Sequence, residues 1–188
     1  MRIILTGVPG TGKTVLCEAL AKKLKLRCIK LNDIVEQYKM YFYISKKDGS
    51  KVVDIKKLED YVTNHLTGED DYIVEGHLAC EFYIPADIVI VLRAHPNTIK
   101  RRLAKRDYPK EKTNNNVMCE VLDYCVIASS KSYRVVKMAE VNTTNKRKET
   151  VVKEIIDILD GKRKPKHIDW SSKMYKTNVN FIKELENR

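Results

Sequence analysis

Long apolar runs are missing from this sequence of 188 residues. No run approaches the ~20 apolar residues that a helix needs to cross a bilayer, which argues against a membrane-spanning protein. At the N-terminus, residues 1–6 lead directly to Gly7, so the apolar core of a secretory signal peptide is missing too. We therefore expect a cytoplasmic protein with no membrane partner.

Cysteines are few and follow no metal-binding pattern. Their number is odd, and no two of them have C-x-x-C spacing: Cys17, Cys28, Cys80, Cys119 and Cys125. A zinc site or a disulfide framework is therefore not expected. The sequence predicts free, buried thiols in a reducing compartment.

Internal repeats and low-complexity stretches are also lacking, and the aromatic residues do not gather into a platform for stacking bases. What is present suits one soluble globular domain, since 43% of the residues are apolar and 32% are charged. Positive charge is in excess, with a net charge of +11. This excess favours anionic partners such as nucleotides, RNA or acidic surfaces. Basic residues cluster in two segments, residues 100–112 and residues 162–188.

Strand and helix patterns alternate along the chain. Strands are expected at residues 2–6, 27–31, 72–75, 87–92 and 133–142, and helices at residues 13–24, 32–40, 54–67, 97–106, 114–130 and 148–160. The near-continuous apolar block at 87–92 is typical of a strand that is covered on both faces. The alternation predicts a three-layer α/β domain around a parallel sheet with right-handed crossovers.

Local signals mark some boundaries of these elements. Asp48-Gly49 lies between β-prone flanks, so residues 42–53 should form a turn or hairpin. Asn32 or Asp33 is placed to cap the helix at 32–40, and Asp54 to cap the next helix. Gly161 should end the last helix.

The strongest motif is Gly7-Val8-Pro9-Gly10-Thr11-Gly12-Lys13-Thr14, which fits G-x-x-x-x-G-K-[ST] between an expected strand and an expected helix. Glycines let successive backbone N–H groups curl around a phosphate, and the helix N-terminus adds positive potential. Lys13 would reach the β- and γ-phosphates of ATP, and the hydroxyl of Thr14 would ligate Mg²⁺. The motif alone does not separate a kinase from an ATPase, a GTPase or a motor.

A carboxylate near the Mg²⁺ is expected at the carboxyl end of a neighbouring strand. Glu75 ends the strand at 72–75, whereas Asp87 begins its strand and should point away from the nucleotide. His77 follows two residues after Glu75 and could orient water or accept a proton. A solvated turn carboxylate and a structural histidine are the simpler alternatives.

Several further segments resemble one family. They are Glu75-Gly76-His77, residues 87–93, Arg102-Leu103, Arg106-Asp107-Tyr108, Lys112, Asn116 and Cys119-Glu120. Together with the phosphate motif they resemble the small adenylate kinase family of archaea and eukaryotic nuclei, which is also linked to maturation of the small ribosomal subunit. The resemblance covers about residues 1–160. It implies a P-loop fold with a five-stranded parallel sheet in the order 2-3-1-4-5, and transfer of a phosphoryl group from ATP to AMP.

The resemblance also implies regions. Residues 30–53 would close over the acceptor monophosphate, and residues 105–115 would form a short lid. Residues 1–160 would form the kinase domain, and residues 161–188 would be a basic appendage that is packed on the body or partly mobile.

Individual residues receive roles from the same resemblance. The ATP phosphates would be lined by Gly10, Gly12, Lys13, Thr14 and Val15, with Arg106 contacting ATP and Lys146 lying in the loop under the adenine. Thr14 and Glu75 would hold the metal. The catalytic set would be Lys13, Glu75, His77, Arg93, Arg102 and Arg106.

Two positions depart from the family pattern. Glu75 stands where the family commonly has aspartate, so its carboxylate is one methylene further out. Glu36 stands where the family often has a basic residue, and a carboxylate there should repel a monophosphate. Lys39 or Arg93 would then have to bind the acceptor.

Three functions remain open from the sequence. The first is an ATP:AMP phosphotransferase that is expected to act as a monomer. The second is a nucleotide-dependent assembly factor that binds a small-subunit ribosomal protein or pre-ribosomal RNA, with ATP hydrolysis releasing the partner and AMP transfer incidental. The third is a kinase for another monophosphate or a small metabolite. For the basic tail, solubility or adaptation to a salty or hot cytoplasm is the simpler explanation.

Overall fold

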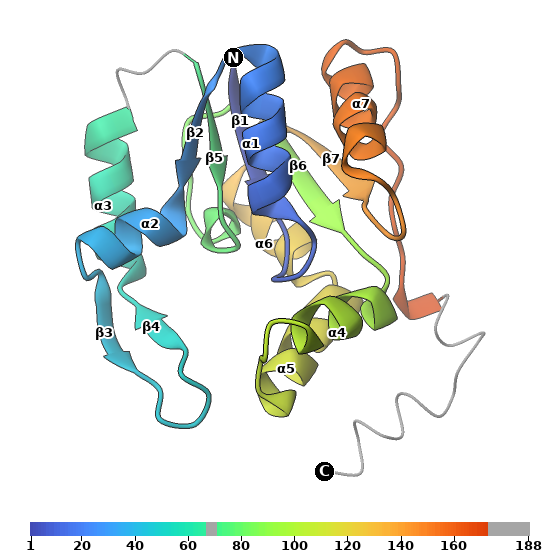
Figure 1. Cartoon of the computed structure of the whole chain (residues 1–188). Helices are drawn as coiled ribbons and strands as arrows, with labels where there is room; N and C mark the ends of the chain where they lie inside the picture. Colours follow the sequence, from blue (N-terminus) through green and yellow to red (C-terminus); the bar gives the residue numbers. More distant parts are fainter. Residues whose placement is uncertain (67–70, 173–188) are drawn as a thin grey trace.

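The computed structural model of the chain describes residues 1–66 and 71–172. A five-stranded parallel sheet forms its centre, in the order β2-β5-β1-β6-β7 (Figure 1). The strands are β1 (Arg2–Thr6), β2 (Arg27–Lys30), β5 (Tyr72–Glu75), β6 (Ile88–Arg93) and β7 (Lys137–Asn142). Numbered within this sheet alone, the order is 2-3-1-4-5, which confirms the predicted architecture.

Helices cover both faces of the sheet (Figure 1). One face packs against α1 (Lys13–Leu24) and α7 (Lys148–Leu159). The other face packs against α2 (Leu31–Gln37), α3 (Ile55–Leu66), α4 (Pro96–Ala104), α5 (Lys110–Val121), α6 (Tyr124–Ser132) and the short 3₁₀ helix η1 (Leu78–Cys80).

The pattern of β1 shows why two cores form. Ile3 and Leu5 pack toward α1 and α7, whereas Ile4 packs into the core on the opposite face. This follows from the strand period, since successive side chains point to opposite faces. In β6 all residues are buried, which confirms the prediction of a strand that is covered on both sides.

The hairpin β3 (Tyr41–Ile44) and β4 (Lys51–Val53) follows α2 and projects away from the main sheet (Figure 1). Its turn was expected at Asp48-Gly49, where Gly49 has φ +65° and the Asp48 carboxylate accepts hydrogen bonds from the backbone and hydroxyl of Ser50. Asp54 caps α3 as predicted, since its carboxylate accepts a hydrogen bond of 3.0 Å from the backbone N–H of Lys57.

Two local predictions were wrong. Asn32 and Asp33 lie inside α2, which begins after Lys30 and has no side-chain cap. The single helix expected at 114–130 is two helices, α5 and α6, because Asp123 takes a left-handed conformation with φ 55° between them. Because α5 begins at Lys110, the expected lid at 105–115 includes the start of this helix.

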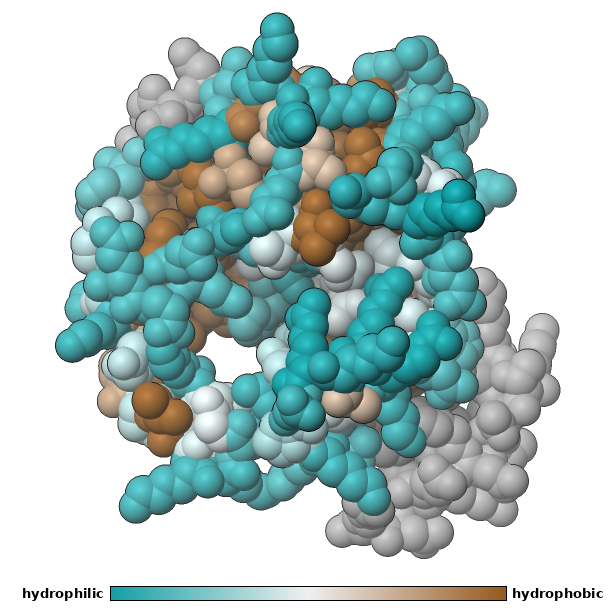
Figure 2. Space-filling model, in the orientation of Figure 1, coloured by the Kyte–Doolittle hydropathy of each residue, from teal (hydrophilic) through white to brown (hydrophobic). Residues whose placement is uncertain are grey.

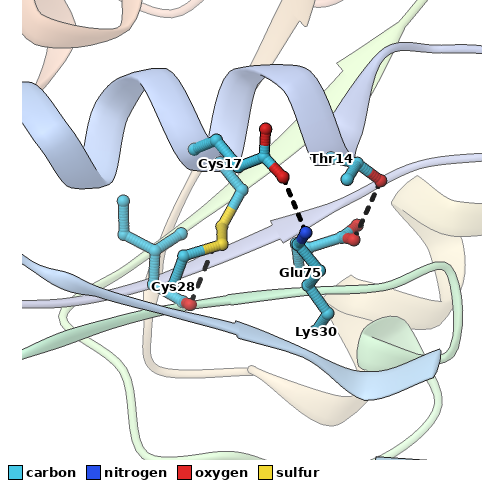
Figure 3. Close-up of a disulfide and its surroundings, with 7 residues drawn as sticks. Thr14, Cys17, Cys28, Lys30 and Glu75 are labelled. Atoms are coloured by element: carbon cyan, nitrogen blue, oxygen red, sulfur yellow. Dashed lines mark hydrogen bonds and ion pairs between the residues drawn. A yellow bond between two sulfur atoms is a disulfide. The ribbon is translucent and has the colours of Figure 1, made fainter. Parts of the chain in front are cut away.

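The prediction of free thiols was wrong for one pair of cysteines. Cys17 on α1 and Cys28 on β2 form a disulfide, with their Cα atoms 6.1 Å apart (Figure 3). The bond joins the helix that follows the phosphate motif to the edge strand of the sheet. Cys80, Cys119 and Cys125 are free, as predicted.

After α7 the chain returns to pack on the body. Ile168 and Trp170 are both buried. The first part of the basic appendage is therefore part of the folded body, and residues 173–188 lie outside the described residues. Within the described part of the chain, every helix is too short or too polar to cross a membrane.

Candidate active site

A cavity of about 740 Å³ opens beyond the carboxyl ends of β1 and β5, where ligands bind in open parallel sheets. Figure 2 shows the molecule hollowed between the hairpin β3–β4 and the α4–α5 region. The residues that line this cavity come from four parts of the chain: 9–15, 32–55, 75–81 and 106–116. The cavity therefore joins the phosphate motif to both of the regions that were expected to close over nucleotides.

Glycines shape the phosphate loop between β1 and α1. Gly7 has φ +136°, and a Cβ there would lie 2.4 Å from the carbonyl oxygen of Leu92. Gly12 is the N-cap residue of α1 with φ 99°. Neither position accepts a larger residue without strain. The N-terminus of α1 consequently faces the cavity, which is a favourable place for phosphate.

Lys13 reaches over this loop from the first turn of α1. Its Nζ donates hydrogen bonds to the carbonyl oxygens of Gly7, at 2.8 Å, and Val8, at 3.2 Å. Burial lowers the pKa of Lys13, while the carboxylate of Glu75 acts in the opposite direction. The amine is thus held at the loop, beside the only strongly buried carboxylate among the described residues that line the cavity.

Thr14 and Glu75 meet at the floor of the cavity. The Thr14 hydroxyl donates a hydrogen bond of 3.0 Å to Oε1 of Glu75, which is 5% exposed (Figure 3). A hydroxyl and a carboxylate are hard oxygen donors that suit Mg²⁺, and Mg²⁺ takes its remaining ligands from water and phosphates. The described residues hold no group of three or more His, Cys, Asp or Glu that could bind a metal alone. This pair could therefore hold a Mg²⁺ that arrives with ATP.

His77 lines the cavity just after β5. Burial, with smaller contributions from Lys13 and Lys112, lowers its pKa to about 4. The imidazole is therefore neutral near pH 7, where it can accept a hydrogen bond or a proton.

Arg106 and Lys112, from the predicted lid, line another part of the cavity wall. The Lys112 ammonium lies 4.9 Å from the ring centroid of Tyr108. On the hairpin, Lys47 forms an ion pair with Glu111 at the start of α5, so the acceptor region and the lid touch across the cavity mouth. Phosphoryl transfer needs such convergent cations, because charge on the moving group must be neutralised.

Arg93 does not face the phosphates, which corrects the prediction of a catalytic role. It is 1% exposed and forms ion pairs with three carboxylates, those of Glu120, Asp123 and Glu140. Oε1 of Glu120 accepts a hydrogen bond from Nε of Arg93 and another, of 2.8 Å, from the indole N–H of Trp170. Arg93 therefore joins β6, α5 and β7 and does not line the cavity.

Arg102 and Lys146 also lie outside the cavity lining. Arg102 donates to the carbonyl oxygens of Gly10, at 2.9 Å, and Thr143, at 3.1 Å, so it supports the phosphate loop from behind. Burial lowers the pKa of Arg102, helped by Arg101 and Arg106. The amine of Lys146 is 2.6 Å from Glu154 on α7. The structure directs both side chains to protein groups, contrary to the predicted contacts with nucleotide.

Part of the predicted acceptor region, residues 30–53, lines the cavity. The family often has a basic residue at position 36, where this chain has Glu36. Neither Lys39 nor Arg93 can take over its role, because neither lines the cavity. The cation there is Lys51 on β4, which forms an ion pair with Glu36. Lys51 was not among the predicted site residues; its signal in the sequence is a basic residue on the returning strand of the expected hairpin.

The parallel sheet, the glycine loop and the Thr14–Glu75 pair together define a P-loop nucleotide-binding protein. A family model described as "AAA domain" matches residues 3–123. A "Putative adenylate kinase" of Methanocaldococcus jannaschii is 35% identical over 176 residues, covering 93% of this chain and 96% of that protein. A protein of the same name from Pyrococcus furiosus is 35% identical over 186 residues, covering 97% of this chain and 98% of its own length. The chain belongs to the archaeal adenylate kinase family.

Solved structures of a different kinase share the fold. Shikimate kinase from Acinetobacter baumannii, in complex with shikimate, matches with a TM-score of 0.60 at 19% identity, covering 86% of this chain and 94% of that chain. Shikimate kinase from Bacteroides thetaiotaomicron matches with a TM-score of 0.57 at 22% identity, covering 85% and 98%. At these identities the likeness shows the P-loop kinase fold alone.

Proposed function

We propose that this protein is an adenylate kinase that transfers the γ-phosphoryl group of Mg²⁺-bound ATP to AMP. A phosphate oxygen of AMP forms a bond to Pγ, and the bond between Pγ and the β–γ bridging oxygen breaks, with its electron pair staying on the departing ADP. Two ADP result. The observation that carries the proposal is a single cavity that joins the phosphate loop to a second, acceptor-side region. The names of the family members support the same reaction.

The residues that line the cavity receive distinct roles. Lys13 and Arg106 would neutralise charge on the phosphates, and Thr14 with Glu75 would hold Mg²⁺. When bound there, Mg²⁺ would neutralise negative charge on the phosphates. His77, neutral at working pH, would accept a hydrogen bond near the attacking group. Contact between the hairpin and α5 would restrict water, which would otherwise hydrolyse ATP.

The test is to incubate the protein with ATP and Mg²⁺, with and without AMP, and to measure ADP and free phosphate separately. We expect two ADP for each AMP consumed, with little phosphate. Lys13→Ala should abolish the transfer and leave the circular dichroism spectrum unchanged, because the hydrogen bonds of Lys13 go to carbonyls of the phosphate loop and join no other element. Full transfer by a folded Lys13→Ala variant would show that this loop does not bind the phosphates of ATP.

The alternative of a ribosome-assembly factor has a separate observation in its favour. Basic side chains on α4, among them Arg101, are exposed. Figure 2 shows a strongly hydrophilic surface over the α4 region, beside the hollow. Phosphate release that is indifferent to AMP would favour this alternative. So would salt-sensitive retention of a small-subunit ribosomal protein or pre-ribosomal RNA, whereas no retained partner at low salt would count against it.

A further inference from the structure

Glu36 and Lys51 form an ion pair on the acceptor side of the cavity. Glu36 comes from α2 and Lys51 from β4, so the pair connects two elements of the acceptor region. Both side chains line the cavity. The Lys51 ammonium also lies 4.7 Å from the ring centroid of Tyr41 on the paired strand, and its side chain is only 26% exposed. Two partners thus hold this lysine at the cavity wall.

The distribution of charge around the cavity gives Lys51 its importance. The cations among the described lining residues are Lys13, Lys51, Arg106 and Lys112. Lys13 belongs to the phosphate loop, and Arg106 and Lys112 belong to the lid wall. Lys51 is therefore the cation that the acceptor region itself supplies, beside the carboxylates of Glu36 and Asp48. A dianionic phosphate cannot approach these carboxylates favourably without it.

We propose that Lys51 binds the phosphate of the acceptor nucleoside monophosphate, and that Glu36 holds Lys51 in place for this contact. The inference rests on the proposed function and names the residue that recognises the acceptor. A lysine ammonium has three donors on a flexible stem, so it can keep a hydrogen bond to Glu36 while it donates to phosphate. Glu36 thereby acts as a positioning residue, and its charge weakens the binding of acceptor.

The first experiment measures KM for AMP and KM for ATP in Lys51→Ala, Lys51→Arg and Glu36→Gln. Lys51→Ala should raise KM for AMP by about 10- to 100-fold, the range for a lost charge-assisted hydrogen bond, and leave KM for ATP within about twofold. Lys51→Arg should keep KM for AMP within about fivefold of wild type, because it retains the charge. Glu36→Gln should lower KM for AMP, because the amide oxygen still accepts a hydrogen bond from Lys51 and keeps it in place, while the repelling charge is gone. Lys46→Ala is the matched control, since Lys46 is an exposed lysine of the same hairpin that does not line the cavity.

The double variant Glu36→Gln/Lys51→Ala separates two explanations. If Lys51 binds the phosphate, KM for AMP in the double variant stays at least about tenfold above wild type. If Lys51 only neutralises Glu36, removing both charges returns KM for AMP to within about twofold of wild type, and the proposal is overturned.

Calorimetric binding of AMP to the wild type, Lys51→Ala and Lys46→Ala keeps this test independent of turnover. Wild-type binding of AMP without AMP-dependent formation of ADP would remove the proposed function, and a weaker affinity in Lys51→Ala would still support Lys51. Transfer with an unchanged KM and affinity for AMP in Lys51→Ala would overturn the inference and leave the kinase intact. A wild type that neither binds AMP nor transfers to it would overturn both.

Discussion

Arg93 is buried among three carboxylates that lie far from it in the sequence, Glu120, Asp123 and Glu140. The sequence predicted a central strand at 87–92, and Arg93 is the last residue of the observed strand β6. The sequence could not show that an acidic group from α5 and another from β7 would meet there, because those contacts depend on tertiary packing. Lys13, Thr14, Glu75 and His77 all line the cavity, and the sequence could bring them together because a contiguous loop and one adjacent strand end position them.

Replacing Arg93 should destabilise the fold rather than impair the chemistry. Arg93→Met leaves Glu120 and Glu140 buried without their cation, which should cost about 3–5 kcal/mol in the free energy of unfolding. Urea denaturation measures this loss, and Arg134→Met, at an exposed position, should change stability by less than about 0.5 kcal/mol. A stable Arg93→Met variant with a raised KM for ATP would restore Arg93 to the active site.

His77 should make the protein less stable in mild acid. Its pKa is lowered from 6.5 to about 4 in the folded state, mainly by burial. Between these values the unfolded chain binds more protons, so stability falls as the pH drops through this window, by up to about 1.4 kcal/mol per pH unit. Urea denaturation at pH 7 and pH 5 should therefore show a larger loss for wild type than for His77→Gln. Equal losses would contradict a buried, neutral His77. Glu140 raises the pKa of His167, and this group changes the pH dependence of stability equally in both proteins.

At the scale of elements, periodicity predicted most helices and strands because each buries one continuous apolar face. The break between α5 and α6 was missed because Asp123 carries no glycine or proline beside it, and its left-handed turn places its carboxylate on Arg93. The bond between Cys17 and Cys28 was missed for a related reason. A disulfide between a helix and an edge strand leaves no spacing motif in the sequence.

The disulfide predicts that reduction destabilises the first βαβ unit. Cys17 and Cys28 are separated by 11 residues in the sequence, and a bond that closes so short a loop contributes about 2–3 kcal/mol by restricting the unfolded chain. Adding dithiothreitol should therefore lower the free energy of unfolding of wild type by about this amount. The Cys17→Ala/Cys28→Ala variant should be insensitive to the reductant. An identical response of both proteins to dithiothreitol would exclude the bond.

At the scale of the whole molecule, the chain after α7 completes the body beside β7. Ile168 and Trp170 are buried, and His167 hydrogen-bonds to Glu140 at 2.7 Å. The rings of Trp170 and His95, the N-cap residue of α4, lie in a T-shaped arrangement with their centroids 5.4 Å apart. The weak periodicity of this segment hid the contact, because two anchoring side chains create no pattern. The segment therefore connects the sheet to the helix that leads into the lid.

Trp170→Phe tests whether this segment stabilises the whole fold. The substitution keeps an aromatic ring and removes the N–H that donates to Oε1 of Glu120. Burial raises the pKa of Glu120, while Arg93, Ala94 and Trp170 act in the opposite direction, so losing one donor leaves a buried carboxylate less well satisfied. We expect a loss of about 1–3 kcal/mol in the free energy of unfolding, measured with urea by circular dichroism.

Because Trp170 is the only tryptophan in the sequence, the fluorescence emission of the wild type reports on this segment alone. A wild-type emission typical of water, with an unchanged stability in Trp170→Phe, would show that the segment does not dock in solution.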